Sequence, residues 1–378
     1  MMKRKVCVVV ASRANYGRIK SAMTAIAEQN NLELQVVVSA SALLDRFGRA
    51  IDVIQKDGFE VSAKVYVVLE GETPTTMAKT TGLAIIELAT ILENLKPDVV
   101  VSVADRFETL ATAVAASYMN IPVAHTQGGE TSGSIDQSVR HAITKLSHLH
   151  FPATDLAKQK LIELGEEESR IVVVGCPAID LLLDLPPLTQ EIFGRTKGAG
   201  QVPDLSKPYI LVVQHPVTTE YSMARRQIEE TLRAVSTLGM QTIWLWPNVD
   251  AGSEDLSRGI RVYREQGKKD HIGFYKNFSP GDYATLLKNA ECIVGNSSSG
   301  IREAEFLGTP CVNIGTRQSG RERGENVVDV EHDKSQIESA IKKAVDHGRF
   351  SSQLLYGDGT AGVKIADYLA NCHFRIQK

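Results

Sequence analysis

Short apolar runs rich in β-branched residues recur along the chain, and stretches with helical spacing separate them. This alternation predicts parallel strands with helices on both faces of each sheet. The first series of predicted strands is Val6–Val10, Leu34–Val38, Asp98–Val103, Pro122–His125 and Ile171–Val174. The second series is Ile210–Val213, Thr242–Leu245, Ile272–Phe274, Cys292–Val294 and Cys311–Ile314. Two series of this kind predict two doubly wound α/β domains.

A Pro/Gly-rich stretch separates the two series. It contains Asp184–Leu188 and Gly198–Pro208, and such composition is typical of a linker or a domain border. We place the boundary near residue 190, so that residues 1–189 form the first domain and residues 190–378 the second. The chain of 378 residues, 43% of them hydrophobic, is long enough to bury two cores of ordinary size.

The overall charge excludes a general attraction to nucleic acid or anionic lipid. The formal net charge is −3 and the sequence pI is about 6.3, so any recognition of phosphate has to be local. No apolar run approaches membrane-spanning length, and Val6–Ala11 is too short for a signal-peptide core. We therefore expect a cytoplasmic protein that binds neither nucleic acid nor a membrane.

The five cysteines indicate free thiols. They are scattered without a CxxC pair, which fits buried, reduced side chains in a reducing compartment. His141, His148 and His150 have no carboxylate or cysteine partner at metal-ligand spacing, so we expect no metal site.

The segment from Ile293 to Gly315 predicts a strand, a polar turn, a helix, a second turn and a strand. Unpaired N–H groups and a partial positive charge at a helix N-terminus make residues Asn296–Gly300 a natural seat for phosphate. Glu303, one turn inside the predicted helix, would then accept hydrogen bonds from ribose hydroxyls. The competing interpretation is a Ser-rich turn that merely caps the helix.

Polar residues also follow the predicted strands of the first domain. Ligands of open α/β sheets collect at the carboxyl ends of the strands. Arg13 follows the first strand, where it would meet a diphosphate or lie as an ordinary surface residue, and Asp105 follows the third. Asp105 is open to two interpretations: an acid or base, or a cap for a helix that begins at Arg106.

The fourth strand adds Glu130 and Asp136 to the same edge. The Gly128-Gly129 pair before Glu130 indicates tight backbone packing around a ligand. If Asp105, Glu130 and Asp136 converge, each carboxylate raises the pKa of the others, as general acid/base catalysis requires.

The second domain has corresponding strand-end residues. His215 follows its first strand, Asn248 and Asp250 follow its second, and Arg317 follows its last. No predicted strand leads into a GxGxxG motif and the sequence lacks GxxxxGK[ST], which argues against dinucleotide redox chemistry and P-loop hydrolysis. Ser299 lacks the GxSxG setting of a hydrolase nucleophile.

Taken together, these segments resemble the hydrolysing UDP-N-acetylglucosamine 2-epimerases, the first-step enzymes of sialic acid synthesis, over essentially the whole chain. The motifs that carry the resemblance are Ser12-Arg-Ala14, Asp105-Arg-Phe-Glu108, Gly128-Gly-Glu130, Ile135-Asp136, Arg140-His-Ala-Ile-Thr-Lys145, Gly175-Cys-Pro177, Gln214-His-Pro-Val-Thr-Thr219, Pro247-Asn-Val-Asp-Ala-Gly252, Gly295-Asn-Ser-Ser-Ser-Gly300 and Gly315-Thr-Arg-Gln318. The resemblance implies a GT-B-like fold of two Rossmann-type domains, a nucleotide sugar in the cleft between them, and a final helix that returns to the first domain. It also implies a homodimer or homotetramer.

In such enzymes UDP leaves by elimination across C1 and C2, and water adds to the resulting glycal to give free N-acetylmannosamine, with no cofactor. By resemblance, Ser297, Ser298 and Arg317 hold the phosphates, Glu303 holds the ribose and the backbone near Phe278 holds the uracil. The resemblance further assigns Arg13, Arg106, His215, Asn248 and Asp250 to the diphosphate and sugar, with His215 counted among the catalytic residues. Asp105 and Asp136 match acid/base positions, and Glu130 lies close to them in sequence.

Two positions depart from the family pattern. Gln127 stands where relatives often have a catalytic Glu, and an amide cannot exchange a proton at working pH, so we keep it as a substrate contact. Ala42 stands where relatives often place a His near the sugar. Both lie in the sugar-binding domain, so a UDP- or GDP-linked 2,4-diacetamido-6-deoxy sugar of legionaminic acid routes stays an alternative substrate. A GT-B glycosyltransferase and a non-catalytic nucleotide-sugar-binding protein stay alternative functions.

Overall fold

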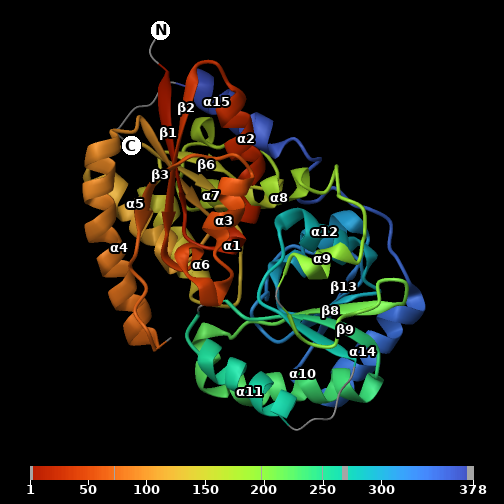
Figure 1. Ribbon diagram of the computed structural model, residues 1–378. Coiled ribbons are helices and arrows are strands. Elements are labelled where there is room, and N and C mark those ends of the chain that lie inside the picture. The colour runs from red at the N-terminus through yellow and green to blue at the C-terminus, as the bar shows by residue number, and fades with distance from the viewer. Residues whose placement is uncertain (1–2, 72, 197, 249, 266–270, 373–378) are drawn as a thin grey trace.

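The computed structural model describes residues 3–71, 73–196, 198–248, 250–265 and 271–372. The described strands form two sheets, and each sheet lies between layers of helices (Figure 1). The first sheet contains β1 (Arg4–Val10), β2 (Leu32–Ser39), β3 (Val61–Val65), β4 (Val99–Val103), β5 (Val123–Thr126) and β6 (Leu149–Phe151). They pair in parallel in the order β3-β2-β1-β4-β5-β6.

Helices cover both faces of the first sheet. The helices of this region are α1 (Arg13–Gly17), α2 (Lys20–Glu28), α3 (Ala50–Lys56), α4 (Pro74–Leu95), α5 (Phe107–Tyr118), α6 (Asp136–Leu146), α7 (Asp155–Glu163) and α8 (Pro177–Asp180), with 3₁₀ turns at Ala40–Leu43, Asp45–Phe47 and Glu168–Arg170. Alternate valines of β1 point to opposite faces: Val8 joins the core under α2 and α3, and Val9 joins the core under α4 and α5. Burial on both faces explains why this strand is a continuous apolar run.

The second sheet contains β7 (Gly198–Gly200), β8 (Tyr209–Val213), β9 (Gln241–Leu245), β10 (Ile272–Tyr275), β11 (Ile293–Gly295), β12 (Cys311–Ile314) and β13 (Val327–Val330). Their order is β13-β12-β11-β8-β9-β10-β7, and only β7 among them is antiparallel to its neighbour. The accompanying helices are α9 (Glu191–Gly194), α10 (Ala224–Leu238), α11 (Ser253–Glu265), α12 (Pro280–Asn289), α13 (Glu303–Leu307), α14 (Lys334–His347) and α15 (Ala361–Asn371), with 3₁₀ turns η4 (Thr218–Met223) and η5 (Ser298–Gly300).

In both sheets the strand order reverses beside the first strand of the series. The reversal falls between β1 and β4 in one sheet and between β8 and β11 in the other. Crevices form at such points at the carboxyl ends of the strands. These four strand ends therefore mark where a ligand site is expected, and the carboxyl end of β1 leads directly into α1.

The strand predictions were right for most segments and wrong for one. Ile171–Val174 is not a strand: Ile171 makes a single bridge with His150, and the chain then turns at Gly175 (φ 89°) into α8. β6 takes that place in the sheet but has only three residues, too few for a visible pattern. β3, β7 and β13 were missed because each is short or only partly buried and so lacks a continuous apolar run. β7 also lies within the stretch predicted as a linker.

The last helix, α15, packs against α2 at the far end of the first domain, where Figure 1 shows it in blue beside the red N-terminal elements. We propose the domain boundary near residue 190, because Ile192 and Phe193 of α9 already belong to a core of the second sheet. All five cysteines are free, and four are buried. Among the described helices, none is both long and apolar enough to cross a membrane.

Candidate functional site

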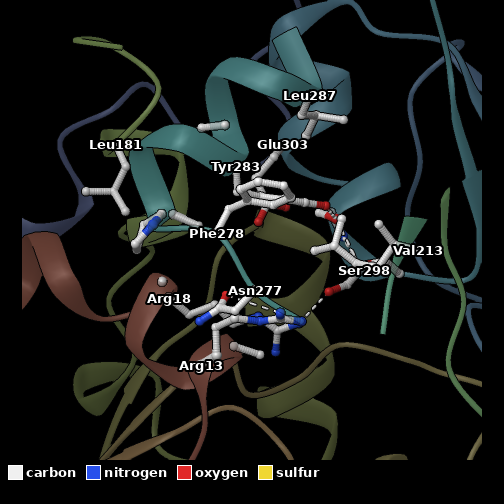
Figure 2. A pocket seen from close by; sticks show the side chains of 18 of the residues that line it. Arg13, Arg18, Leu181, Val213, Asn277, Phe278, Tyr283, Leu287, Ser298 and Glu303 are labelled. Atoms are coloured by element: carbon white, nitrogen blue, oxygen red, sulfur yellow. Dashed lines mark hydrogen bonds between the residues drawn. The ribbon is translucent and has the colours of Figure 1, made fainter. Parts of the chain in front are cut away.

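Two adjoining cavities lie between the domains, at the strand ends where the sheet order reverses. The first, here the apolar cavity, is lined by Leu181, Leu182, Val213, Phe278, Tyr283 and Leu287 among others (Figure 2). The second, here the charged cavity, is lined by Asp105, Arg106, Ser132, Asp136, Arg317 and Arg321 among others. Both cavities share Arg18, His215, Asn248, Ser297 and Ser298. A ligand with an apolar end and an anionic middle fits this arrangement.

Aromatic packing fixes one wall of the apolar cavity. The Phe278 ring lies 5.0 Å from the Tyr275 ring and 6.2 Å from the Phe193 ring, centroid to centroid. The Tyr283 hydroxyl is 2.5 Å from the Ser299 hydroxyl, which joins α12 to the Ser-rich turn. A planar ring would find a preformed slot here.

The Ser-rich turn differs from the predicted helix start. Ser298–Gly300 form the 3₁₀ turn η5, and α13 begins only at Glu303. The Ser297 hydroxyl accepts a hydrogen bond from the Ser299 N–H at 3.3 Å, so it caps η5. The turn packs so closely on β12 that a Cβ added at Gly300 would lie 2.5 Å from Cys311 Sγ. Glycine is therefore required at this position.

Glu303 is the first residue of α13 and lines the apolar cavity (Figure 2). Its Oε2 atom is buried and has no hydrogen-bond partner among the described residues. A buried carboxylate oxygen without a donor costs free energy, and a hydroxyl from a ligand would satisfy it.

His215 is held as a neutral ring that donates from Nε2. Its Nδ1 accepts the Asn248 backbone N–H at 3.1 Å, which leaves the proton on Nε2. The Asn296 side chain accepts from the His215 N–H at 2.7 Å and donates to its carbonyl at 2.8 Å. Burial and then Arg317 and other arginines keep the pKa of His215 well below its usual value.

Two arginines from the first domain reach the second. Arg13 donates to the Lys276 carbonyl at 2.8 Å and to Asn277 Oδ1 at 3.1 Å. Arg18 donates to the Ser298 hydroxyl and lies 3.8 Å from Asp105 (Figure 2 draws both arginines). The Ser298 hydroxyl of the Ser-rich turn therefore faces a cation of the opposite domain.

Asp105 lines the charged cavity and is surrounded by guanidinium groups. It accepts from Arg140, and its carboxylate lies 3.8 Å from both Arg18 and Arg321. Burial raises the pKa of Asp105, but Arg140, Arg18 and Arg321 outweigh burial and hold the pKa far below its usual range. Its interpretation as a helix cap is wrong, because α5 begins after Arg106 with no side-chain cap.

Asp136 opens α6 on the other side of the charged cavity, 3.9 Å from Arg317. Burial and the negative charge of Asp105 raise the pKa of Asp136. The expectation of mutually raised pKa values thus holds for Asp136. It is wrong for Asp105 and Glu130, because arginines outnumber the carboxylates around both.

Glu130 and Gln127 lie behind the cavity wall. Neither is among the residues that line the two cavities. Glu130 pairs with Arg302 at 2.5 Å and with Arg321 at 3.2 Å. Burial raises the pKa of Glu130, but Arg302 and Arg321 lower it to about 2. Gln127 is fully buried and accepts from Arg302 at 2.9 Å, so its contacts give no support to a direct substrate contact.

Arg106 bridges the domains through two carboxylates. It lies 3.1 Å from Glu108 in α5 and 2.9 Å from Asp250 in the second domain. Burial lowers the pKa of Arg106, but Asp250 and Glu108 raise it above the usual value. Asp250 is thus a partner of Arg106, and we propose that it acts on a substrate only through that residue. Val249, within the quoted Pro247–Gly252 motif, lies outside the described residues.

The backbone is strained where the first-domain strands meet the cavity. Ala104 and Gln127, each at or just beyond a strand end, have φ of 64° and 61° although neither is glycine. His125 Nε2 in β5 lies 2.7 Å from the Ala104 carbonyl, so this contact holds the first of the two strained positions. Strain of this kind persists where surrounding contacts impose it, commonly at functional sites.

A comparison with protein families decides the membership. The family model described as UDP-N-acetylglucosamine 2-epimerase matches residues 24–370. The chain belongs to this family. The fold agrees, since a solved UDP-GlcNAc 2-epimerase from Methanocaldococcus jannaschii, in complex with UDP-GlcNAc and UDP, superposes with a TM-score of 0.78 at 20% identity over 97% of this chain and 99% of that one. The two sheets therefore form a GT-B-type pair of Rossmann-like domains.

Two relatives of the family are similar over nearly the whole chain. A UDP-N,N'-diacetylbacillosamine 2-epimerase (hydrolyzing) from Legionella pneumophila is 34% identical over 95% of this chain and 93% of its own. A GDP/UDP-N,N'-diacetylbacillosamine 2-epimerase (hydrolyzing) from Campylobacter jejuni is 34% identical over 88% of this chain and 85% of its own. The family and these two relatives are therefore UDP-sugar 2-epimerases by description, and the similarity extends over both domains of this chain.

The sequence interpretation missed Arg18 and Arg302, and it gave Arg140 no role. It included Arg321 only as one of several arginines in the charged loop after the last predicted strand, which could provide a phosphate contact or be an ordinary solvated loop. Each of these four is buried or nearly so at the domain interface. Arginines in helical or loop segments are mostly exposed, so the pattern of hydrophobic and polar positions gave no signal that these are buried. The position of Arg302 directly after the Ser-rich turn was the available clue.

Proposed function

We propose that the protein is a hydrolysing 2-epimerase of a nucleotide-activated 2-acetamido sugar, with UDP-N,N'-diacetylbacillosamine preferred over UDP-N-acetylglucosamine. The observation that carries the reaction is the charged cavity. It brings Asp105 and Asp136 to face Ser297, Ser298 and Arg317 across the domain interface. The preference for the diacetamido sugar rests on the two relatives, whereas Ala42 and Gln127 had left that sugar only as an alternative substrate.

The reaction has two steps. A base removes the C2 proton, the C1–O bond breaks, and the nucleoside diphosphate leaves with the bonding electrons to give a C1=C2 glycal. Water then adds hydroxide to C1 and a proton to C2 from the opposite face, which inverts C2. The C2 proton is weakly acidic, so the site has to position a base and stabilise the departing diphosphate.

We assign the proton transfers by charge. Asp105 remains ionised beside Arg140 and Arg18, so it is the candidate base. Asp136 has a raised pKa and is the candidate to hold and return a proton. Neutral His215, which donates from Nε2, would hydrogen-bond the diphosphate rather than exchange a proton.

The binding roles follow the two cavities. Phe278 and Tyr283 would hold the base, Glu303 the ribose, and Ser297, Ser298, Arg317 and Arg18 the diphosphate. Arg13, Arg106 and Asn248 would close over the diphosphate and sugar, because each lines a cavity at the domain interface. We also propose a homodimer or homotetramer, which light scattering behind a sizing column tests.

A proton NMR time course in D2O tests the function. The purified protein is incubated separately with UDP-N,N'-diacetylbacillosamine, its GDP counterpart and UDP-N-acetylglucosamine. We expect free sugar with deuterium at C2 plus nucleoside diphosphate, formed fastest from the UDP-diacetamido sugar. Equal or faster turnover of UDP-N-acetylglucosamine would reverse the substrate preference, and persistence of all three substrates would refute the proposed reaction.

A further inference from the structure

Arg321 is a buried guanidinium that lines the charged cavity without a full set of partners. Its side chain is 3% exposed and shares the cavity wall with Asp105, Arg317 and Ser298. Its Nη1 lies 3.2 Å from Glu130 and its Nη2 3.8 Å from Asp105. Nε has no hydrogen-bond partner among the described residues, and Nη1 faces Glu130 without the geometry of a hydrogen bond. A buried donor without an acceptor is costly, and an oxygen of a ligand in the cavity that Arg321 lines would supply one.

Contacts behind the wall of the charged cavity hold the Arg321 guanidinium in position. Glu130 faces Arg321 from one side and Arg302 from the other, and Arg302 also donates to Gln127 at 2.9 Å. The Arg302 guanidinium lies over the Tyr356 ring at 5.5 Å, which closes the space beyond it. With Glu130 held in this way, Arg321 projects from a fixed anion toward the cavity.

The local charges leave an excess of cations. Arg18, Arg140, Arg302 and Arg321 surround the two carboxylates Asp105 and Glu130. Burial lowers the pKa of Arg321 to about 10; Glu130 opposes this change, while Arg302 and Arg140 add to it. Arg321 therefore stays charged at neutral pH. A neutral amide at Gln127, instead of a carboxylate, preserves the excess.

We propose that Arg321 binds the β-phosphate of the nucleoside diphosphate and stabilises the charge that develops on it as it leaves. The Ser-rich turn and Arg317 line the same cavity, so a diphosphate seated there lies within the reach of Arg321. The bidentate fork of a guanidinium suits two phosphate oxygens. The catalytic part of this inference rests on the proposed function, whereas the binding part rests on the cavity.

Calorimetric binding of UDP and UMP separates the β-phosphate from the rest of the nucleotide. In Arg321→Met we expect the affinity for UDP to fall at least tenfold and the affinity for UMP to stay within twofold of wild type. Arg321→Lys keeps the charge without the fork, so its loss for UDP should be intermediate. It serves as the second variant where Arg321→Met does not fold.

Arg349→Met is the matched control. Arg349 lies in the same domain and donates to Thr309 Oγ1 at 2.9 Å and to the Ala290 carbonyl at 3.0 Å, outside both cavities. Its UDP and UMP affinities should match wild type.

An unchanged ratio of UDP to UMP affinity in both Arg321 variants would overturn the inference, and so would an equal loss for both nucleotides. Failure of wild type to bind UDP would overturn it as well. Arg321-dependent UDP binding without turnover of any of the three nucleotide sugars would support the inference and refute only the proposed function.

Discussion

The two cavities differ in how far their polar groups are already satisfied. In the apolar cavity, Tyr283 bonds to Ser299 and Arg13 bonds to Asn277 before any ligand enters, although Glu303 Oε2 has no partner among the described residues. In the charged cavity, Arg321 is paired with carboxylates but its Nε has no acceptor among the described residues, and arginines outnumber the carboxylates. A preorganised, satisfied pocket favours binding of the ground state. A cavity whose arginines are incompletely neutralised favours a state of the substrate in which negative charge develops.

The sharpest test of this difference is Asp105→Asn. Loss of the base should lower kcat at least 10³-fold, within the range of about 10²–10⁴ for positioned general bases together with the disturbed neighbouring arginines. UDP affinity should not fall, because Asp105 is not itself a proposed UDP contact and its neutralisation leaves the charges of Arg18 and Arg321 free for the diphosphate. Asp155→Asn, an exposed carboxylate-to-amide change at the start of α7, is the control. Turnover near wild type, or a large loss of UDP binding, would contradict the division between the cavities.

Asp136→Asn addresses the proton donor in the charged cavity. An acid with a raised pKa is protonated below that pKa, so the wild-type rate should fall as pH rises through it. The amide cannot donate an exchangeable proton, and kcat should fall about 10²-fold. The measurement is a pH profile of kcat for both proteins. An alkaline decline that survives in Asp136→Asn would assign the donor to another group.

The domain architecture was predictable because buried parallel strands leave long apolar runs, as β1 and β8 do. Edge strands such as β3, with alternating partly buried positions, leave weaker signals. Strand-end residues Asp105, Asp136, His215 and Ser298 were found because topology brings such positions together. The arginines that keep Asp105 ionised could not be found in this way, because Arg18 and Arg321 come close to Asp105 only through the tertiary fold. The predicted acid/base role of Glu130 shows the limit: sequence gave its proximity but not the cavity wall that covers it.

The phosphate seat that we propose at the Ser-rich turn and Arg317 should respond to a double substitution. Ser298→Ala with Arg317→Ala removes a hydroxyl and a guanidinium that face the diphosphate position. Hydrogen bonds to charged groups contribute about 1.5–3 kcal/mol each, so loss of two of them should lower UDP affinity by about 10²-fold or more. Calorimetry of the double variant and of both single variants measures this loss. Unaffected UDP binding would move the phosphate seat away from the Ser-rich turn.

Glu130→Gln tests whether a residue behind the wall is structural support or a proton-transfer group. Removing this anion leaves Arg302 and Arg321 facing each other, so the free energy of unfolding should fall by about 3 kcal/mol. The groups that face Glu130 are Arg302, Arg321, Arg140 and Tyr356, with Asp105 beyond Arg140. We expect kcat to fall about tenfold while the pH profile keeps its wild-type shape. Loss of one limb of that profile would make Glu130 an acid/base residue after all.

The smallest effect is expected from the apolar cavity itself. Tyr283→Phe keeps the ring that lines the slot and removes only the hydroxyl bonded to Ser299. A neutral hydrogen bond contributes about 0.5–1.5 kcal/mol, and Ser299 keeps Ser297 as a second partner at 2.9 Å, so UDP affinity should fall about threefold with kcat unchanged. Calorimetry and steady-state kinetics on the preferred sugar measure both quantities. A fall in kcat as large as that of Asp136→Asn would mean that the apolar cavity takes part in the chemistry, and the contrast between a satisfied binding pocket and an under-neutralised reaction pocket would fail.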